Sequence, residues 1–183
     1  MSHRLLLAIV TVVALGAAPP ASAQQLPPPP AGFTWVEAVN GAGSFLRPDG
    51  WFTKEEEQGD THAFFVTKTP IGHGGRFDIG LTVNAFDHVA RRGAPPSAWA
   101  SAMAARLTIG REVLKSTVVK GNAADMHIVR VVDTRGGRPV VIHYLVIGND
   151  AKDRAWLIFF EAPQSDWDAT YPIAQPMLNA FGL

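Results

Sequence analysis

Four ionisable side chains lie in one short segment, between a predicted strand and a predicted helix: Asp87, His88, Arg91 and Arg92. A carboxylate, an imidazole and two guanidinium groups can exchange protons or pair with a charged ligand or partner. Binding residues frequently lie on loops that join rigid elements. We therefore predict that these four residues form a partner- or ligand-binding site. The alternative is an ordinary hydrated connection, because loops are polar by default.

The sequence lacks the patterns of enzymes that use a nucleophilic side chain. It has no G-x-S-x-G motif around a serine, and it contains no cysteine. The segment His73-Gly74-Gly75 is similar to part of an oxyanion loop, but the serine that such a loop would serve is missing. Its glycines are more typical of a flexible hairpin tip.

Paired carboxylates are another route to acid–base catalysis. Asp78 and Asp87 flank one predicted strand, and the sequence places no partner beside either of them. Asp166 and Asp168 start a predicted helix, where capping and the helix dipole account for them. We therefore predict no catalytic residue and no enzyme activity. The remote alternative is a hydrolase with a dispersed site, at Asp87 or His88.

Metal-binding patterns are also missing. None of the six histidines has H-x-H or H-E-x-x-H spacing. Without cysteine, zinc and iron–sulfur sites built on thiolates are excluded. His127 and His143 fall on neighbouring predicted strands, and a cross-strand pair of this kind is the one arrangement that could ligate a metal. We predict no metal site and no cofactor.

The N-terminus has the features of a secretory signal peptide. Arg4 is followed by an apolar run from Leu5 to Ala18 and then by Ala21-Ser22-Ala23. The run is shorter than the roughly 20 residues that a membrane-spanning helix needs. We predict that residues 1–23 are removed after Ala23 and that the protein is exported, to the periplasm of a Gram-negative cell and otherwise to the medium. Without a cysteine it cannot carry a bacterial lipid anchor, so we expect neither lipidation nor a membrane span.

The rest of the chain is predicted to be a linker and one domain. Residues 24–32 contain four consecutive prolines, which favour an extended spacer; a docking peptide is the alternative. Residues 33–183 have the size of one globular domain. The 16 basic and 16 acidic residues give a formal net charge of zero, without a basic stripe, so we predict no nucleic-acid partner.

Most of the domain has the apolar patterns of strands, separated by turn residues. The predicted strands are 33–39, 44–47, 51–54, 61–69, 77–86, 112–120, 123–133, 138–147 and 154–161. Short glycine-containing joints in the second half predict antiparallel hairpins. The polar run 55–60 is predicted to be a hydrated loop.

Two segments have helical apolar spacing, residues 96–110 and 165–180. Pro172 and Pro176 lack the N–H that an interior helical position donates, so they predict a break or kink near Tyr171. The predicted fold class is α+β, with a single antiparallel sheet of about six or seven strands and helices on both faces.

The order of elements resembles the PsbP-like family. The residues that carry the resemblance are the segment from Ser44 to Trp51, the helix near residue 100, the four-strand meander and a C-terminal helix with Trp167 and Tyr171. The family includes the extrinsic subunit of the photosynthetic oxygen-evolving complex, and a Ran-binding import factor shares its fold. The resemblance implies an α/β/α sandwich and a non-catalytic role bound to a larger partner, with no transferable active-site residue.

These observations predict an exported, non-catalytic accessory or binding module of the cell envelope with a protein partner. A periplasmic small-ligand or metal-binding protein is the alternative. A ligand for such a protein would occupy a cleft between sheet and helix.

Overall fold

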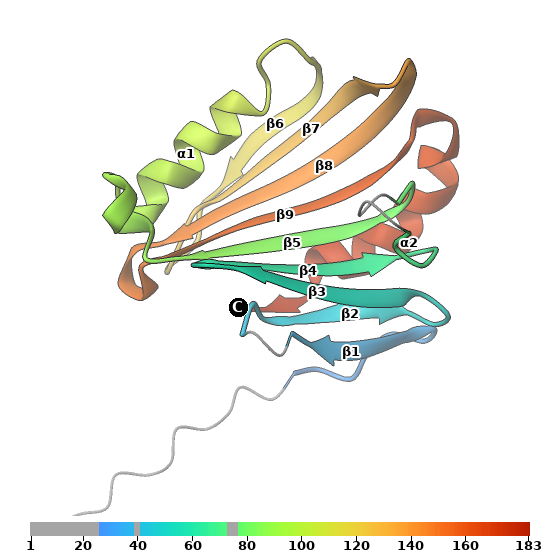
Figure 1. The fold of residues 1–183 in the computed structure, drawn as a ribbon, viewed down its shortest axis with the longest axis horizontal. Helices are drawn as coiled ribbons and strands as arrows, with labels where there is room; N and C mark the ends of the chain where they lie inside the picture. Colours follow the sequence, from blue (N-terminus) through green and yellow to red (C-terminus); the bar gives the residue numbers. More distant parts are fainter. Residues whose placement is uncertain (1–25, 39–40, 73–76) are drawn as a thin grey trace, which may run out of the picture.

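The computed structural model describes residues 26–38, 41–72 and 77–183, and these form two sheets and two α-helices (Figure 1). The predicted signal peptide, 1–23, and the His73-Gly74-Gly75 segment lie outside the described residues. Within the described ranges, no helix is long and apolar enough to cross a membrane.

The main sheet has seven strands in the order β3-β4-β5-β9-β8-β7-β6, and every neighbouring pair is antiparallel. Its strands are β3 (Phe52–Gln58), β4 (Thr61–Thr67), β5 (Gly80–Asp87), β6 (Glu112–Val119), β7 (Met126–Arg135), β8 (Arg138–Asn149) and β9 (Arg154–Pro163). The predicted hairpins from β6 to β9 are therefore present as a meander. The predicted loop 55–60 is instead mostly strand β3, because its residues pair in register with β4 at the sheet edge, where charged side chains stay in water.

The predicted α+β class is confirmed, but the prediction of a single sheet is wrong. A second sheet contains β1 (Phe33–Glu37), β2 (Ser44–Pro48) and β10 (Phe181–Gly182) in the order β1-β2-β10. Phe181 pairs with Phe45 and Gly182 with Ser44. The small sheet forms because Phe45 and Leu46 of β2 are fully buried against the main sheet and need paired strands around them.

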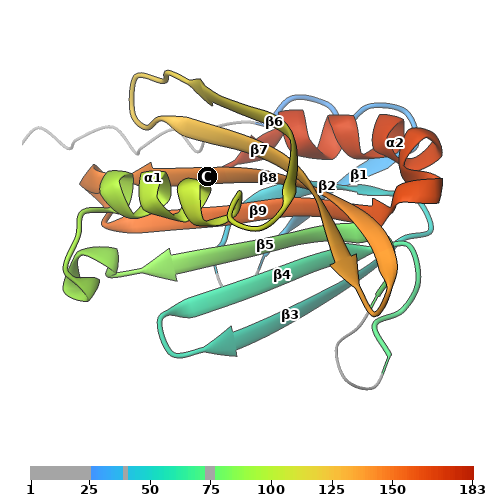
Figure 2. The ribbon, with the colours of Figure 1, turned by 90° about the horizontal axis from the view of Figure 1, so that it is seen from above.

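The core has two parts, one on each face of the main sheet, and β8 contributes to both in alternation. Val141, Leu145 and Ile147 belong to the cluster that also contains residues of β2 and of α2 (Trp167–Asn179). Ile142, Tyr144 and Val146 belong to the cluster that contains α1 (Pro96–Arg106). Figure 2 shows α1 and α2 lying along different parts of the sheet.

Helix α1 begins at Pro96, as predicted, and its N-terminus lies against the end of β8. The carboxylate of Asp150 accepts hydrogen bonds from the backbone N–H and the hydroxyl of Ser97, both at 2.8 Å. Gly148 is so close to the helix that a Cβ atom there would lie 2.0 Å from the carbonyl oxygen of Pro96. The inward face of α1 is Ala100 and Ala104, whose small side chains let the helix approach the sheet.

Helix α2 is continuous through both of its prolines, so the predicted break near Tyr171 is absent. Pro172 has no N–H to donate to the carbonyl of Asp168, four residues earlier. Both residues are exposed. Water can therefore hydrate that carbonyl. The buried side of the helix, with Ala174, Met177 and Leu178, holds it against the sheet.

The predicted linker is partly in contact with the domain. The indole N–H of Trp35 donates a 2.7 Å hydrogen bond to the carbonyl of Pro27. The proline segment from residue 26 therefore runs back along β1 before the sheet begins.

We expect Gly148→Ala to destabilise the fold, because its Cβ would overlap the backbone at the start of α1. Overpacking of this kind costs about 1–3 kcal/mol of unfolding free energy. Urea unfolding of the purified domain measures this loss. Gly72→Ala is the matched control, since no atom lies within 4 Å of a Cβ built there. Equal unfolding midpoints for the two variants would contradict the close approach.

Candidate functional site

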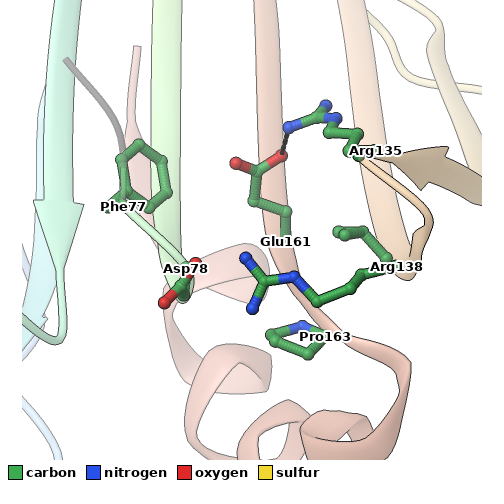
Figure 3. A pocket seen from close by; sticks show the side chains of 8 residues that line it. Phe77, Asp78, Arg135, Arg138, Glu161 and Pro163 are labelled. Atoms are coloured by element: carbon green, nitrogen blue, oxygen red, sulfur yellow. Dashed lines mark hydrogen bonds and ion pairs between the residues drawn. The ribbon is translucent and has the colours of Figure 1, made fainter. Parts of the chain in front are cut away.

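A pocket of about 480 Å³ opens on the face of the main sheet that α1 covers, at the opposite end of β8 from Gly148 (Figure 3). Phe77 and Asp78 lie just before β5, Arg135, Gly136 and Arg138 belong to the β7–β8 hairpin, and Val140, Glu161 and Pro163 lie on β8 and β9. The sheet thus brings three separate segments of the chain to one site.

The tight turn of the β7–β8 hairpin places two arginines on the rim of this pocket. Gly136 and Gly137 have φ values of 58° and 81°, the left-handed conformations that a two-residue hairpin turn of this type requires. Arg135 and Arg138 are consequently direct cross-strand partners. Like charges directly opposite each other destabilise a hairpin. The two arginines therefore repel each other, and the hydrogen bond of Arg135 to the carboxylate of Glu161 offsets part of that repulsion.

Glu161 is the buried carboxylate of the pocket, with only 6% of its surface exposed. Its Oε2 accepts a 2.7 Å hydrogen bond from Nη1 of Arg135. Burial raises the pKa of Glu161, and the charge of Arg135 and its hydrogen bond oppose that rise. Arg135 also lies 3.8 Å from the carboxylate of Asp133, which in turn pairs with Arg111 at 3.3 Å. Alternating charges thus extend from the pocket toward β6.

The other two charged groups of the pocket face each other. In Figure 3 the guanidinium of Arg138 extends toward the carboxylate of Asp78, and the ring of Phe77 stands across from Glu161. Asp78 and Arg138 do not approach within ion-pair distance, and neither has an ion pair with any described residue. The site therefore has one satisfied charge pair and one open pair.

Sequence reasoning missed most of this site. From the sequence, Asp78 is one of two carboxylates that flank a strand, and Glu161 is the last residue of a predicted strand. The available signals were the single carboxylate that ends the apolar run of β9 and the two arginines that flank a glycine pair in the β7–β8 turn.

The structure divides the four residues of the predicted binding segment. Asp87 pairs with Arg154, whose Nη2 donates to Oδ2 at 2.8 Å, and His62 Nε2 lies 3.1 Å from the same oxygen. The hydrogen bond from Arg154 lowers the pKa of Asp87, with smaller contributions from its charge and from His62. Asp87 therefore joins β4, β5 and β9 into one unit.

The other three residues of that segment are exposed. His88 has a left-handed backbone, with φ of 53°, and Nδ1 lies 4.0 Å from a carboxylate oxygen of Asp153. Arg91 and Arg92 lie in the short 3₁₀ segment η1 (Val89–Arg92), and the Arg92 guanidinium is 5.3 Å from the centre of the Phe86 ring. Asp87 and Phe86 point to opposite faces of the sheet, so the four residues do not converge. Their role in binding stays a prediction.

The proposed cross-strand histidine pair does not form. His127 pairs with Val146, and His143 pairs with Arg130. Among the described residues, no group of three histidine or acidic side chains could hold a metal ion. His143 is instead buried, and its Nδ1 accepts a 3.0 Å hydrogen bond from Nε of Arg130.

Arg130 and His143 belong to a cluster on the α2 face of the sheet. The Arg130 guanidinium lies 4.2 Å from the ring centre of Tyr171 and 5.2 Å from that of Trp167. The two rings stack on each other with centres 4.8 Å apart. Burial lowers the pKa of His143 to about 4, and the charges of Arg130 and Lys115 add to that effect. The imidazole is therefore neutral at physiological pH and acts as an acceptor, which gives the cluster a structural role.

The two edges of the main sheet differ in their side chains. β3 carries Lys54 and the glutamates 55–57, the kind of charged edge that resists pairing with another chain. Every residue of β6 is exposed, and its four large apolar side chains are 44–49% exposed; they are Val113, Leu114, Val118 and Val119. The register with β7 shifts between Val113 and Lys115, which leaves Leu114 in a bulge. No described strand pairs with the outer side of β6.

An apolar groove of about 380 Å³ continues from the end of β6. Val119 lines it together with side chains of β7, β9 and the C-terminal segment, including Met126, Trp156 and Leu183. The unpaired edge and the groove meet at Val119, and we call the two together the β6 surface.

Comparison with known proteins finds similarity of fold only. No family model matches the chain, and no curated protein is significantly similar to it. Cyanobacterial PsbP (CyanoP) from Synechocystis sp. has 10% sequence identity and a TM-score of 0.52, over 92% of this chain and 98% of that protein. The resemblance to the PsbP-like family is thus confirmed at the level of the fold.

Two further solved structures are similar with lower TM-scores. The Ran-binding protein Mog1p of Saccharomyces cerevisiae has 16% identity and a TM-score of 0.48, over 81% of this chain and 94% of that protein. A protein of Bacteroides thetaiotaomicron has 13% identity and a TM-score of 0.47, over 82% of this chain and 48% of the other. This chain therefore spans about half the length of the Bacteroides protein.

The buried His143 predicts a loss of stability in acid. The unfolded chain binds a proton on this imidazole below its ordinary pKa of 6.5, whereas the folded protein binds it only near 4. Between these values the unfolded state holds more protons, so the free energy of unfolding should fall by about 3 kcal/mol as the pH is lowered. Urea unfolding at several pH values between these limits measures the slope.

His143→Gln should reduce that slope, because its amide oxygen can still accept the hydrogen bond from Arg130 but does not titrate. His88→Gln is the matched control and should keep the slope, since it removes an imidazole whose side chain is 50% exposed. An unchanged slope in His143→Gln would show that other groups cause the acid sensitivity.

Proposed function

We propose that this protein is an exported, non-catalytic accessory module of the cell envelope that binds a protein partner through the β6 surface. The observation that carries the proposal is the unprotected edge of β6. A strand at the edge of a sheet presents unpaired N–H and C=O groups, and proteins normally protect such edges with charges. This sheet has that protection on β3, where residues 54–57 are all charged. β6 has only Glu112 and Lys115, and its last four residues, Ser116–Val119, are uncharged.

The chemistry of the β6 surface defines the partner. An extended segment can add to the sheet by backbone hydrogen bonds to β6, and alternate side chains of that segment then lie over Val113 and Val118. The groove beyond Val119 is lined mainly by apolar side chains, so it accommodates a large apolar side chain at one end of the segment. The partner is therefore a protein with an extended segment that is uncharged and contains an apolar anchor.

The shared fold supports the same proposal. The sequence resembles the PsbP-like family, for which a non-catalytic role bound to a larger partner is implied, and the chain has the fold of cyanobacterial PsbP over most of its length. Export is proposed from the leader sequence, whose predicted cleavage site is followed by a short proline-rich segment.

Crosslinking in cells, followed by affinity recovery and mass spectrometry, tests the β6 surface. We expect one envelope protein to be recovered reproducibly with the wild-type chain and roughly tenfold less with Val118→Lys, because the new charge would have to be buried at the edge. Thr53→Lys is the matched control on β3 and should recover as much as the wild type. Both substitutions are at exposed positions, so the unfolding midpoints should stay unchanged.

Two results would contradict binding at the β6 surface: equal recovery with Val118→Lys and wild type, or recovery of the chain alone. Crosslinks only between copies of this chain would show that the edge pairs with a second copy. That result would replace the accessory role with self-association.

Export has a separate test. Expression of the full chain in a Gram-negative host should give a periplasmic protein whose intact mass begins at Gln24. Substituting Ala23 by a large charged residue should block cleavage and retain the leader, because the peptidase requires small residues at that position. A protein that stays in the cytoplasm with its first 23 residues attached would overturn the proposal of export.

A further inference from the structure

The pocket at the β7–β8 hairpin is a second site, separate from the β6 surface. Its volume of about 480 Å³ falls in the range of sites for small molecules. Among the described residues, its lining has two acidic and two basic side chains; Glu161 and Arg135 pair with each other, and Asp78 and Arg138 stay open. A ligand that pairs with both open groups carries charges of both signs.

The acidic side of the pocket can receive a cation. Only one oxygen of Glu161 is used by Arg135, and in Figure 3 the other oxygen points toward the ring of Phe77. An ammonium group placed there could donate hydrogen bonds to the carboxylates of Glu161 and Asp78 and would lie near the ring of Phe77.

The basic side of the pocket can receive a carboxylate. Arg138 has no ion pair with any described residue, and its guanidinium extends into the pocket toward Asp78 (Figure 3). The planar guanidinium fork matches the two oxygens of a carboxylate. A molecule that carries an ammonium and a carboxylate on the same carbon atom would therefore fit between Asp78 and Arg138, where the two side chains do not reach each other.

The remaining wall is apolar. Val140 and Pro163 line the pocket beside these charged groups. We propose that this pocket binds a free amino acid with an apolar side chain, its ammonium group held by Glu161 and Asp78, its carboxylate by Arg138, and its side chain against Val140 and Pro163.

The burial of Glu161 makes the binding depend on pH. Because burial raises the pKa of this carboxyl, it takes up a proton at a higher pH than an exposed glutamate does, and the protonated form presents no charge to an ammonium group. The groups that face Glu161 are Arg135 and Asp133 of β7, Tyr144 of β8 and Asp78 before β5. Affinity should therefore increase as the pH is raised through the pKa of Glu161.

Isothermal titration of the mature protein with L-leucine tests the proposal, with L-valine and L-methionine as size variants. The matched probes are 4-methylpentanoate, which lacks the ammonium group, and 3-methylbutylamine, which lacks the carboxylate. We expect at least one of the three amino acids to bind, and the two analogues of leucine to bind roughly tenfold to a hundredfold more weakly than leucine, since each loses hydrogen bonds to charged groups.

Variants of the protein test the residues. Arg138→Gln and Asp78→Asn should each weaken amino-acid binding roughly tenfold or more. Arg106→Gln is the matched control, an exposed arginine on α1 outside the pocket, and should bind as the wild type does. Circular dichroism and the unfolding midpoint of each variant distinguish a lost contact from a lost fold.

Three results would overturn the proposal. One is the absence of binding by all three amino acids at about 10 mM, beyond the weakest affinity of interest for such a site. Another is equal binding of L-leucine and its two analogues, and the third is unchanged binding by Arg138→Gln. None of these results bears on the β6 surface, whose test measures a protein partner.

Discussion

The central strands β8 and β9 are apolar on both faces, and the rest of the fold depends on covering both. Their alternating side chains enter two separate cores, so neither face can be left in water along its whole length. Helix α1 covers one face, and α2 with the small sheet covers the other. The close contact of Gly148 with Pro96 and the hydrogen bond from Trp156 to the carbonyl of Ala42 fix these covers in place.

The pocket follows from the same constraint. Helix α1 begins at one end of β8 and ends before it reaches the β7–β8 hairpin, so the far part of that face has no helix over it. Apolar residues there would be exposed to water. The chain instead places the exposed Arg135 and Arg138 at this end, and Arg135 pairs with the buried Glu161, so charged side chains line the part of the face that α1 leaves uncovered.

The spacing of apolar residues within a segment predicted those helices and strands that bury a face of their own. The apolar spacing of α1 and of strands β4, β5, β7, β8 and β9 was sufficient, because each of these elements buries one face or two. Strand β10 and the small sheet could not be predicted, since Phe181 pairs with Phe45 across almost the whole chain. The continuity of α2 through Pro172 was missed for a different reason, because it depends on the exposure of one carbonyl.

The residues of the candidate sites also depend on strand pairings that local sequence patterns do not reveal. The sequence predicts a binding role for Asp87 because it is a charged residue beside a loop. The register of the sheet, however, places Arg154 directly opposite Asp87, and the two side chains pair with each other. The sequence does not predict that Glu161 and Asp78 share a site with Arg138, because the three residues are far apart along the chain. Only the pairing of β5 with β9 and of β9 with β8 brings them together.

The position of β10 also determines when the domain can finish folding. Strand β2 is made early in synthesis, but its cover, β10 and helix α2, is made last. Phe45 can stack on Phe64 early, but it lacks its partner Phe181 until residues 167–182 have left the ribosome. Contacts between such distant segments form slowly. The chain must therefore spend this interval with the domain incompletely folded.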